Sequence, residues 1–332
     1  MPKRNPSRLL HGPEDEIVAR LAALTASSVP RGLLGIGDDA AVLAPSPHAQ
    51  VLTVDTQVED VHFRRDFAPL DVLGRRAFTA AASDLAAMGA HPRVALLSLV
   101  LPATLGDDEL FALVSGVAAG ADAIGAAVVG GNLSGGSELS ITHTVVGELD
   151  GEPLLRRGAR PGDHLFVTGA PGARALGLAA LLEGRRSEPL LRPFVAAFLS
   201  PVARIAEGRR LRGRATAALD VSDGLAQDLG HLCAASGVGA VLEAERLPFP
   251  PGFVEAAARL GKSPLELALH GGEDYELLFA AAPDSEAAMV GHRIGTITAE
   301  PGLGLLEDGR TRPIEARGYR HFDASAARAQ AR

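Results

Sequence analysis

The stretch Ala215-Thr216-Ala217-Ala218-Leu219-Asp220-Val221-Ser222-Asp223-Gly224 leads from an apolar strand directly into a helix. Ser222 has the residue type of a helix N-cap, and Asp223 would then lie in the first helical turn. Asp220 has no such local role, because it closes an apolar strand, where a carboxylate without a partner is costly. The stretch therefore predicts a strand–helix unit with a candidate ligand-binding carboxylate at Asp220.

Comparable acidic motifs recur along the chain, which contains only two lysines, Lys3 and Lys262. The motifs read Gly35-Ile36-Gly37-Asp38-Asp39, Thr53-Val54-Asp55-Thr56, Ser83-Asp84-Leu85-Ala86 and Gly271-Gly272-Glu273-Asp274. Carboxylates set in apolar or glycine-rich sequence often bind metal ions, and hard oxygen ligands select magnesium or calcium. Magnesium bound in this way usually accompanies a phosphate, so the motifs indicate nucleotide chemistry.

Each motif also has an interpretation without a ligand. Residues 35–39 could form a turn with two solvated acids, and Asp55, on the same strand face as Thr53, could simply end its strand. Asp84 favours a ligand more clearly, because it interrupts a helix that is apolar on most sides and should be buried. Residues 169–172 could receive a phosphate on free amides, but an ordinary turn fits better because the Walker lysine is missing.

Composition narrows the class of protein. The 332 residues suffice for two domains, and the net charge of −8 gives no electrostatic basis for binding nucleic acid or an anionic membrane. No apolar run reaches the roughly 18–20 residues of a transmembrane helix, so we expect a soluble protein. Cys233 is the only cysteine and should be a buried thiol, which fits the reducing cytoplasm. His62 and His143 are single histidines, for which a satisfied structural role is the default.

Hydrophobic periodicity predicts alternating helices and strands, with a domain boundary near residue 150. We expect helices at 14–25, 70–88, 107–124, 173–183, 222–235 and 253–260. We expect strands at 40–43, 51–55, 94–101, 126–129, 139–148, 164–168, 215–220 and 275–280, with Gly130-Gly131-Asn132 as a turn between the fourth and fifth of them. The pattern indicates an α/β or α+β fold with domains 1–150 and 151–332.

Five segments follow one another in a recognisable order. They are Gly35-Ile36-Gly37-Asp38-Asp39-Ala40-Ala41-Val42-Leu43, Asp55-Thr56-Gln57-Val58-Glu59-Asp60-Val61-His62-Phe63, Ser83-Asp84-Leu85-Ala86-Ala87-Met88-Gly89-Ala90, Asp220-Val221-Ser222-Asp223-Gly224-Leu225 and Gly271-Gly272-Glu273-Asp274-Tyr275-Glu276-Leu277. Together they resemble the thiamine-monophosphate kinases, a family of the aminoimidazole-ribonucleotide-synthetase-like superfamily. The resemblance extends from about residue 14 to Phe322, and the third and fifth segments together give it most of its specificity.

The resemblance implies a fold and an activity. The activity is ATP-dependent phosphorylation of thiamine monophosphate to thiamine diphosphate, the last step of thiamine diphosphate biosynthesis, with several magnesium ions. The fold is a homodimer whose N-terminal sheets pair into a barrel-like interface. Domain 1–150 would bind ATP and magnesium and form the dimer, and the α/β domain 151–332 would complete the active site.

The resemblance also implies roles for individual residues. Magnesium ligands, some of them through water, would be Asp38, Thr53, Asp55, Asp84, Asp220 and Asp223. ATP contacts would be Gly131, Arg156, Ser222 and the backbone carbonyl of Val54, and thiamine-phosphate contacts would be His62, Glu273 and Tyr319. Asn132 departs from the aspartate common at its position, but its amide oxygen can still ligate magnesium and contact ATP without adding charge.

Two other functions remain open at this stage. One is a superfamily relative that uses ATP on another acceptor, such as a carbonyl, selenide or carbamoyl group. The lack of a catalytic cysteine near the N-terminus argues against selenide, and the Gly271–Leu277 segment argues against the others. The second is a non-catalytic sensor of magnesium nucleotide.

Overall fold

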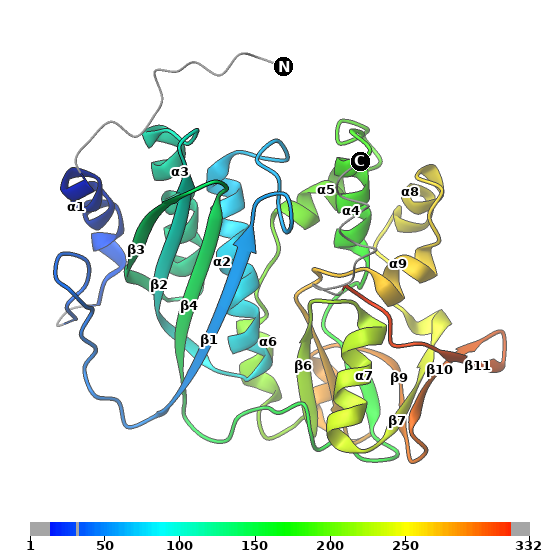
Figure 1. The fold of residues 1–332 in the computed structure, drawn as a ribbon. Coiled ribbons are helices and arrows are strands. Elements are labelled where there is room, and N and C mark those ends of the chain that lie inside the picture. Colours follow the sequence, from blue (N-terminus) through cyan, green and yellow to red (C-terminus); the bar gives the residue numbers. More distant parts are fainter. Residues whose placement is uncertain (1–13, 31–32, 320–332) are drawn as a thin grey trace. The chain divides into compact units, whose positions relative to one another are not determined.

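The computed structural model describes residues 14–30 and 33–319, and their contacts divide into two compact units (Figure 1). Unit 1 takes in the described residues up to Leu85 together with Pro92–Asp150. Unit 2 takes in Ala86–His91 and the described residues from Gly151 onward. Phe322, where the family resemblance ends, lies outside the described residues. The fold is a mixed α/β architecture with one sheet in each unit.

Unit 1 is built on a four-stranded sheet in the order β1-β4-β2-β3. The neighbours β1 and β4 are antiparallel, whereas the neighbours β2 and β3 are parallel. The strands are β1 (Ala49–Val58), β2 (His91–Pro102), β3 (Ala127–Gly136) and β4 (Ser140–Leu149). The helices are α1 (Glu14–Thr25), the short η2 (Ala26–Ser28), α2 (Leu70–Ala87) and α3 (Asp107–Asp122).

Helix α2 is apolar on most sides because it is covered from two directions. Its Phe78 ring packs edge-on against His143 of β4, with ring centroids 5.5 Å apart. On the other side α3 approaches so closely that a Cβ at Gly116 would lie 1.8 Å from the carbonyl oxygen of Asp71. Helix α2 therefore packs against the sheet with α3 beside it, and both helices lie behind the sheet in the view of Figure 1.

Unit 2 contains a seven-stranded sheet in the order β11-β10-β7-β9-β5-β8-β6, antiparallel except for the pair β10 and β7. Its strands are β5 (His164–Val167), β6 (Ala217–Val221), β7 (Gly239–Glu243), β8 (Glu276–Ala281), β9 (His292–Thr298), β10 (Gly302–Glu307) and β11 (Arg310–Ile314). Its helices are α4 (Ala173–Leu182), α5 (Arg192–Leu199), α6 (Ile205–Leu211), α7 (Leu225–Ser236), η3 (Ala244–Arg246), α8 (Phe253–Arg259), α9 (Pro264–His270) and η4 (Glu286–Met289).

The core of unit 2 lies between this sheet and α7. Leu225, Leu229 and Leu232 of α7 are fully buried against apolar strand residues such as Leu219. Cys233 belongs to the same core, and burial raises the pKa of its thiol to about 11. The prediction of a buried, unreactive cysteine is confirmed.

Two predicted elements of unit 1 are wrong. Residues 40–43 form no strand in the described structure. Val42 makes one isolated bridge to Leu34 and is 57 % exposed. Gly131 and Asn132 are not in a turn but inside β3, opposite Leu97 and Ser98 of β2. A Cβ at Gly131, where φ is 157°, would lie 1.7 Å from the Leu97 carbonyl oxygen. This glycine is therefore required by the close approach of two strands.

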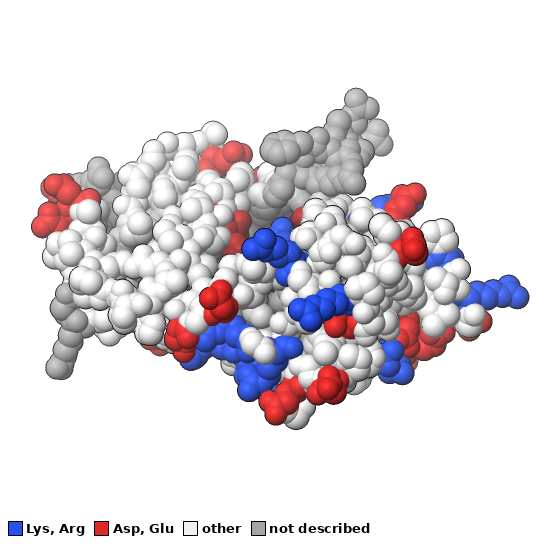
Figure 2. Space-filling model, turned by 90° about the horizontal axis from the view of Figure 1, so that it is seen from below, with Lys and Arg blue, Asp and Glu red and all other residues white. Residues whose placement is uncertain are grey.

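Within the described ranges, no helix combines the length and the apolar character needed to cross a membrane. On the face seen in Figure 2, arginine and acidic side chains lie interspersed rather than in separate areas.

Candidate functional site

In unit 1 the structure brings together three of the predicted ligands, Thr53, Asp55 and Asp84. The pleat of β1 places Thr53 and Asp55 on the face that α2 covers, as their partial burial and the contacts of α2 show. The Thr53 hydroxyl donates a hydrogen bond to the Asp84 carboxylate. Asp84 is half-buried, less than its apolar helix suggested, and its partner is a neutral hydroxyl.

The electrostatics of this group favour a cation. Burial raises the pKa of Asp55, and the negative charge of Asp84 raises it further. In the described part of the chain, no ion pair joins Asp55 or Asp84 to an arginine or lysine. Two neighbouring carboxylates without a cation repel each other, and a hard cation with oxygen ligands removes that repulsion.

His62 belongs to the same group, because its charge lowers the pKa of Asp55. The backbone amide of Val58 donates to His62 Nδ1 over 3.0 Å, so the neutral ring carries its proton on Nε2. His143, opposite Asp55 in the β1–β4 register, is fully buried, and neither ring nitrogen has a hydrogen-bond partner. Burial lowers the pKa of His143 to about 3, so it is a structural histidine but not a satisfied one.

The remaining predicted residues of unit 1 are more exposed. Asp38 is exposed and accepts the amide of Asp39 at 2.9 Å. Val54 is 64 % exposed and faces away from α2. Gly131 and Asn132 are exposed on β3. Among the described residues, no hydrogen bond or ion pair connects Asp38 or Asn132 to the group around Asp55.

In unit 2 the segment Asp220–Gly224 is arranged by a residue that the sequence analysis missed, Asp228. Its Oδ2 atom accepts the amides of Ser222, Asp223 and Gly224 at 3.0, 3.1 and 3.2 Å. Ser222 is therefore not the N-cap that its residue type suggested. Helix α7 begins at Leu225 after Gly224, and the caps come from Asp228 one turn into the helix.

The acids at this turn lie close to one another. Burial raises the pKa of Asp228 to about 7, and the charges of Asp220 and Asp223 add to the shift. One ligand atom from each of Asp223, Asp228 and His231 lies within 4.8 Å of the others. The turn therefore brings several acids together at the end of β6, and the metal-ligand role of Asp220 stays a prediction.

The predicted substrate residues Glu273 and Tyr319 are attached to the same turn. The amide of Glu273 donates to the Ser222 carbonyl at 2.6 Å, and the amide of Tyr319 donates to the Asp223 carbonyl at 3.0 Å. Glu273 has a left-handed backbone with φ of 63°, a strained state that side-chain-bearing residues rarely adopt. Burial and the charges of Glu273 and Asp223 raise the pKa of the Tyr319 phenol. Arg156 lies elsewhere in unit 2, with an exposed side chain.

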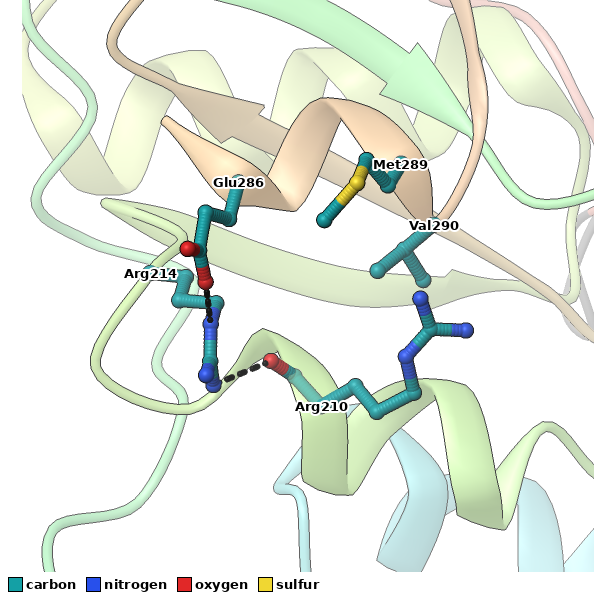
Figure 3. Close-up of a pocket in the computed structure, with 5 residues that line it drawn as sticks. All are labelled: Arg210, Arg214, Glu286, Met289 and Val290. Carbon is teal, nitrogen blue, oxygen red and sulfur yellow. Dashed lines mark hydrogen bonds and ion pairs between the residues drawn. The ribbon is translucent and has the colours of Figure 1, made fainter. Parts of the chain in front are cut away.

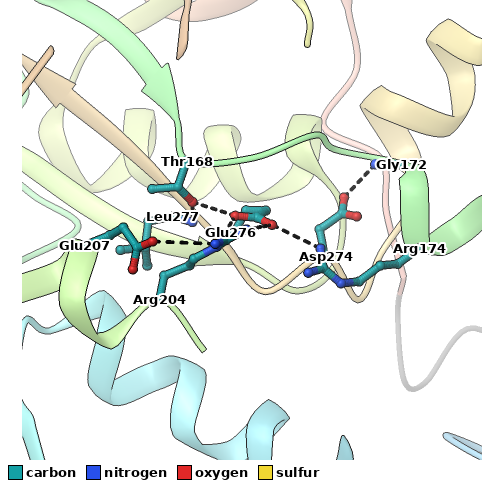
Figure 4. A network of polar contacts seen from close by, with 8 residues as sticks. All are labelled: Thr168, Gly172, Arg174, Arg204, Glu207, Asp274, Glu276 and Leu277. Carbon is teal, nitrogen blue, oxygen red and sulfur yellow. Dashed lines mark hydrogen bonds and ion pairs between the residues drawn. The ribbon is translucent and has the colours of Figure 1, made fainter. Parts of the chain in front are cut away.

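Further along the same motif, Glu276 is held in a network of a different kind (Figure 4). Arg204 donates to both of its carboxylate oxygens, at 2.6 and 2.7 Å, and Arg174 donates at 3.2 Å. The Thr168 hydroxyl completes the set at 2.7 Å. Burial opposes ionisation, but the Arg204 hydrogen bonds and both arginine charges hold the pKa of Glu276 below its usual range. This acid is fully compensated and is structural.

Asp274 binds the glycine-rich turn before α4, residues 169–172, for which the sequence allowed either a phosphate site or an ordinary turn. Its Oδ2 accepts the amide of Gly172 at 2.8 Å, as Figure 4 shows, so the protein's own carboxyl occupies the place that a phosphate would take. Asp274 is fully buried, and burial raises its pKa to about 8. The ordinary-turn interpretation of residues 169–172 is confirmed.

A hollow elsewhere in unit 2 contains none of the predicted residues (Figure 3). It measures about 110 Å³ and is lined by Arg210, Arg214, Glu286, Met289 and Val290. Arg214 is already paired with Glu286 at 3.1 Å. Binding sites for small molecules typically measure roughly 300–1,000 Å³, so the hollow is too small for a nucleotide.

Comparison with known proteins gives matches in both halves of the chain. The N-terminal domain model of the AIR synthase related proteins matches residues 37–149, and the C-terminal domain model matches residues 160–306. The thiamine-monophosphate kinase of Aquifex aeolicus is 36 % identical over 289 residues, which cover 86 % of this chain and 92 % of that protein.

Two solved structures extend the similarity to three dimensions. The thiamine-monophosphate kinase of Stenotrophomonas maltophilia is 35 % identical with a TM-score of 0.79, covering 90 % of this chain and 97 % of that one. A structure described as AaThiL complexed with AMPPCP and TMP is 33 % identical with a TM-score of 0.78, covering 93 % and 97 %. The chain belongs to the AIR synthase related family and, within it, to the thiamine-monophosphate kinases.

Proposed function

We propose that this chain transfers the γ-phosphoryl group of ATP to thiamine monophosphate, giving thiamine diphosphate and ADP. Its relatives are named for this activity, and one related structure contains an ATP analogue together with TMP. The observation that carries the proposal is the group around Asp55 and Asp84, where neighbouring carboxylates without an arginine or lysine partner suit magnesium and its phosphates.

The donor atoms fit magnesium, which prefers carboxylate, hydroxyl and amide oxygens. The proposed ligands are Asp38, Thr53, Asp55, Asp84, Asn132, Asp220 and Asp223. Bound magnesium would offset the charge on the phosphates of both substrates. Asn132 would contribute an oxygen without charge.

The chain's own residues would supply alignment rather than proton transfer. The phosphate of thiamine monophosphate is ionised at neutral pH, so its oxygen can attack the γ-phosphorus without a strong general base. The barrier is then the repulsion between two anions and the requirement for an in-line approach.

Further residues would bind the two substrates. Gly131, Asn132, Arg156, Ser222 and the carbonyl of Val54 would contact ATP. His62, Glu273 and Tyr319 would contact thiamine monophosphate. The thiazolium ring of that substrate carries a positive charge, which a carboxylate such as Glu273 and an aromatic face such as Tyr319 can both attract.

The proposal includes a homodimer formed through the sheet of unit 1. One face of that sheet packs against α2, whereas the other carries exposed apolar side chains, with Leu52 63 %, Val54 64 % and Leu96 39 % exposed. Apolar residues gathered on one sheet face are typical of a surface that a second copy covers. Pairing of two such sheets would give the barrel-like interface.

The direct test is incubation of the purified chain with ATP, magnesium and thiamine monophosphate, followed by chromatography for thiamine diphosphate. We expect thiamine diphosphate and ADP in equal amounts, and neither product when EDTA removes magnesium. ADP formation only with another acceptor would instead support a different transferase of the superfamily. Nucleotide binding without ATP consumption would support a sensor and contradict the proposal.

A further inference from the structure

Asp228 is a buried acid of unit 2 to which the proposed function assigns no role. It is 4 % exposed, and one of its oxygens accepts three consecutive backbone amides, those of Ser222, Asp223 and Gly224. A single carboxylate oxygen that gathers three amides fixes the peptide planes on both sides of Ser222 and Asp223. The orientation of these two side chains therefore depends on Asp228.

The same turn is held from the opposite side through its carbonyl groups. The Ser222 carbonyl accepts the amide of Glu273, and the Asp223 carbonyl accepts the amide of Tyr319. Gln227 donates to the Asp223 carboxylate at 3.0 Å and to the Tyr319 carbonyl at 2.9 Å. With the amides bound by Asp228 and the carbonyls bound by other segments, the turn has little freedom to rotate its peptide units.

We propose that Asp228 is a positioning residue that sets Ser222 and Asp223 for magnesium and nucleotide by holding the amides of their turn. The inference rests on the proposed function, since it assigns these two residues to the bound magnesium nucleotide. Asp228 acts through the backbone and needs no contact with either ligand. Partners that orient metal ligands in this indirect way typically contribute 10- to 100-fold to metal affinity.

Unit 2 provides a matched control in Asp163, a second buried acid that holds backbone at the opposite end of β6. Asp163 is 5 % exposed, and its Oδ2 accepts the Arg160 amide at 2.9 Å and the Thr216 hydroxyl at 2.6 Å. Both acids thus fix a loop next to β6, but only Asp228 fixes the loop with the proposed ligands. Asp163→Ala reports the cost of losing such an anchor without disturbing the magnesium turn.

The test compares Asp228→Ala, Asp228→Asn, Asp228→Glu and Asp163→Ala in the full chain. Hydrogen exchange is followed in peptides that cover residues 220–226, without any ligand. The dissociation constant of Mn²⁺ is measured by electron paramagnetic resonance with a non-hydrolysable ATP analogue present. The magnesium concentration for half-maximal thiamine diphosphate formation provides the third readout.

We expect Asp228→Ala to accelerate exchange in residues 220–226 and to weaken Mn²⁺ binding roughly 10- to 100-fold. Asp228→Asn should stay within about threefold of the parent chain, because its amide oxygen still accepts hydrogen bonds. Asp163→Ala should leave Mn²⁺ binding unchanged. Asp228→Glu keeps the charge but displaces the carboxylate oxygen, so its Mn²⁺ affinity and hydrogen exchange should resemble those of the alanine variant. If Asp228→Ala does not fold, Asp228→Glu replaces it in the test.

Unchanged Mn²⁺ affinity in Asp228→Ala and Asp228→Glu would overturn the proposal. Equal losses in Asp228→Ala and Asp163→Ala would also overturn it, since they would indicate a general loss of stability. A parent chain that binds Mn²⁺ and nucleotide but forms no thiamine diphosphate would refute only the proposed function. Hydrogen exchange and Mn²⁺ affinity would still test the role of Asp228.

Discussion

Asp228 and Glu276 are both buried acids of unit 2, yet their surroundings are opposite. Glu276 is bound by Arg204, Arg174 and Thr168, and despite its burial their hydrogen bonds and charges hold its pKa below the usual range. Burial, with the negative charges of Asp220 and Asp223 added to it, raises the pKa of Asp228 to about 7, and the hydrogen bonds that Asp228 accepts come from neutral amides. Burial is shared by the two acids, and only the charge of their neighbours differs. A shortage of positive charge, rather than burial, therefore marks the acids that suit a metal cation.

In unit 1, Asp55 resembles Asp228 rather than Glu276. Burial and the charge of Asp84 raise the pKa of Asp55, and the charge of His62 offsets only part of this rise. Four predictions test the distinction between compensated and uncompensated acids.

The largest effect on stability should come from the compensated acid. Glu276→Ala would leave the guanidinium groups of Arg204 and Arg174 without their buried carboxylate, which typically costs about 3–5 kcal/mol. Urea unfolding followed by circular dichroism measures the change. The activity per folded molecule should remain. A variant as stable as the parent chain would show that this network is not structural.

The largest effect on activity should come from the acids proposed to bind magnesium. Asp84→Asn and Asp220→Asn should each lower turnover by roughly 100- to 1,000-fold, because each removes a negatively charged ligand of the magnesium proposed to bind the transferring phosphates. Their unfolding free energies without magnesium should not fall, since neighbouring negative charge is relieved. Asp66→Asn, an exposed acid paired with Arg64, serves as the control. Full turnover of either variant at saturating magnesium would exclude that residue as a ligand.

His143 shows the effect of burial on pKa without a contribution from neighbouring charges, because burial alone lowers its pKa to about 3. In the unfolded chain it takes up a proton near its ordinary pKa of 6.5, whereas the folded chain cannot, so stability falls as the pH drops below 6.5. At pH 5 this amounts to about 2 kcal/mol. His143→Phe should reduce the loss of unfolding free energy between pH 8 and pH 5 by about that amount. An identical pH dependence in the two proteins would contradict the assignment.

The smallest of the four effects concerns His62. His62 lies beside Asp55 and is proposed to contact thiamine monophosphate. His62→Ala should therefore raise the KM for thiamine monophosphate by about tenfold, which corresponds to the loss of one polar contact of about 1.4 kcal/mol. The KM for ATP should change less. Steady-state kinetics with each substrate varied in turn measures both. An unchanged KM for thiamine monophosphate would remove His62 from the substrate site.

Local pattern predicted much of the fold. The helix Glu14–Thr25 was predicted to the residue, and α2, α3, α4 and α8 to within two residues at each end. These elements follow from periodicity and capping residues that are neighbours in sequence. Gly131 was misplaced because its conformation depends on the carbonyl of Leu97 in another strand, which no local pattern contains.

The site was predicted in part for the same reason. Asp84 and Asp220 could be singled out because a charge in an apolar element is visible in the sequence. Asp228 was missed because its partners are backbone amides, which carry no residue-type signal. The available signal was an aspartate on the apolar face of α7, three residues after Leu225 and four before Leu232. The compensation of Glu276 was equally hidden, because Arg204 precedes it by 72 residues.

The most direct measurement is a crystal structure with Mn²⁺, AMPPCP and thiamine monophosphate, in which anomalous scattering locates the metal. The predicted result is Mn²⁺ bound directly to a carboxylate oxygen of Asp55 or Asp84 in unit 1, Mn²⁺ bound directly to a carboxylate oxygen of Asp220 or Asp223 in unit 2, and none at Glu276. Mn²⁺ bound at Glu276, or its absence from both of these carboxylate groups while nucleotide is bound, would contradict the claim that a shortage of positive charge marks the metal-binding acids.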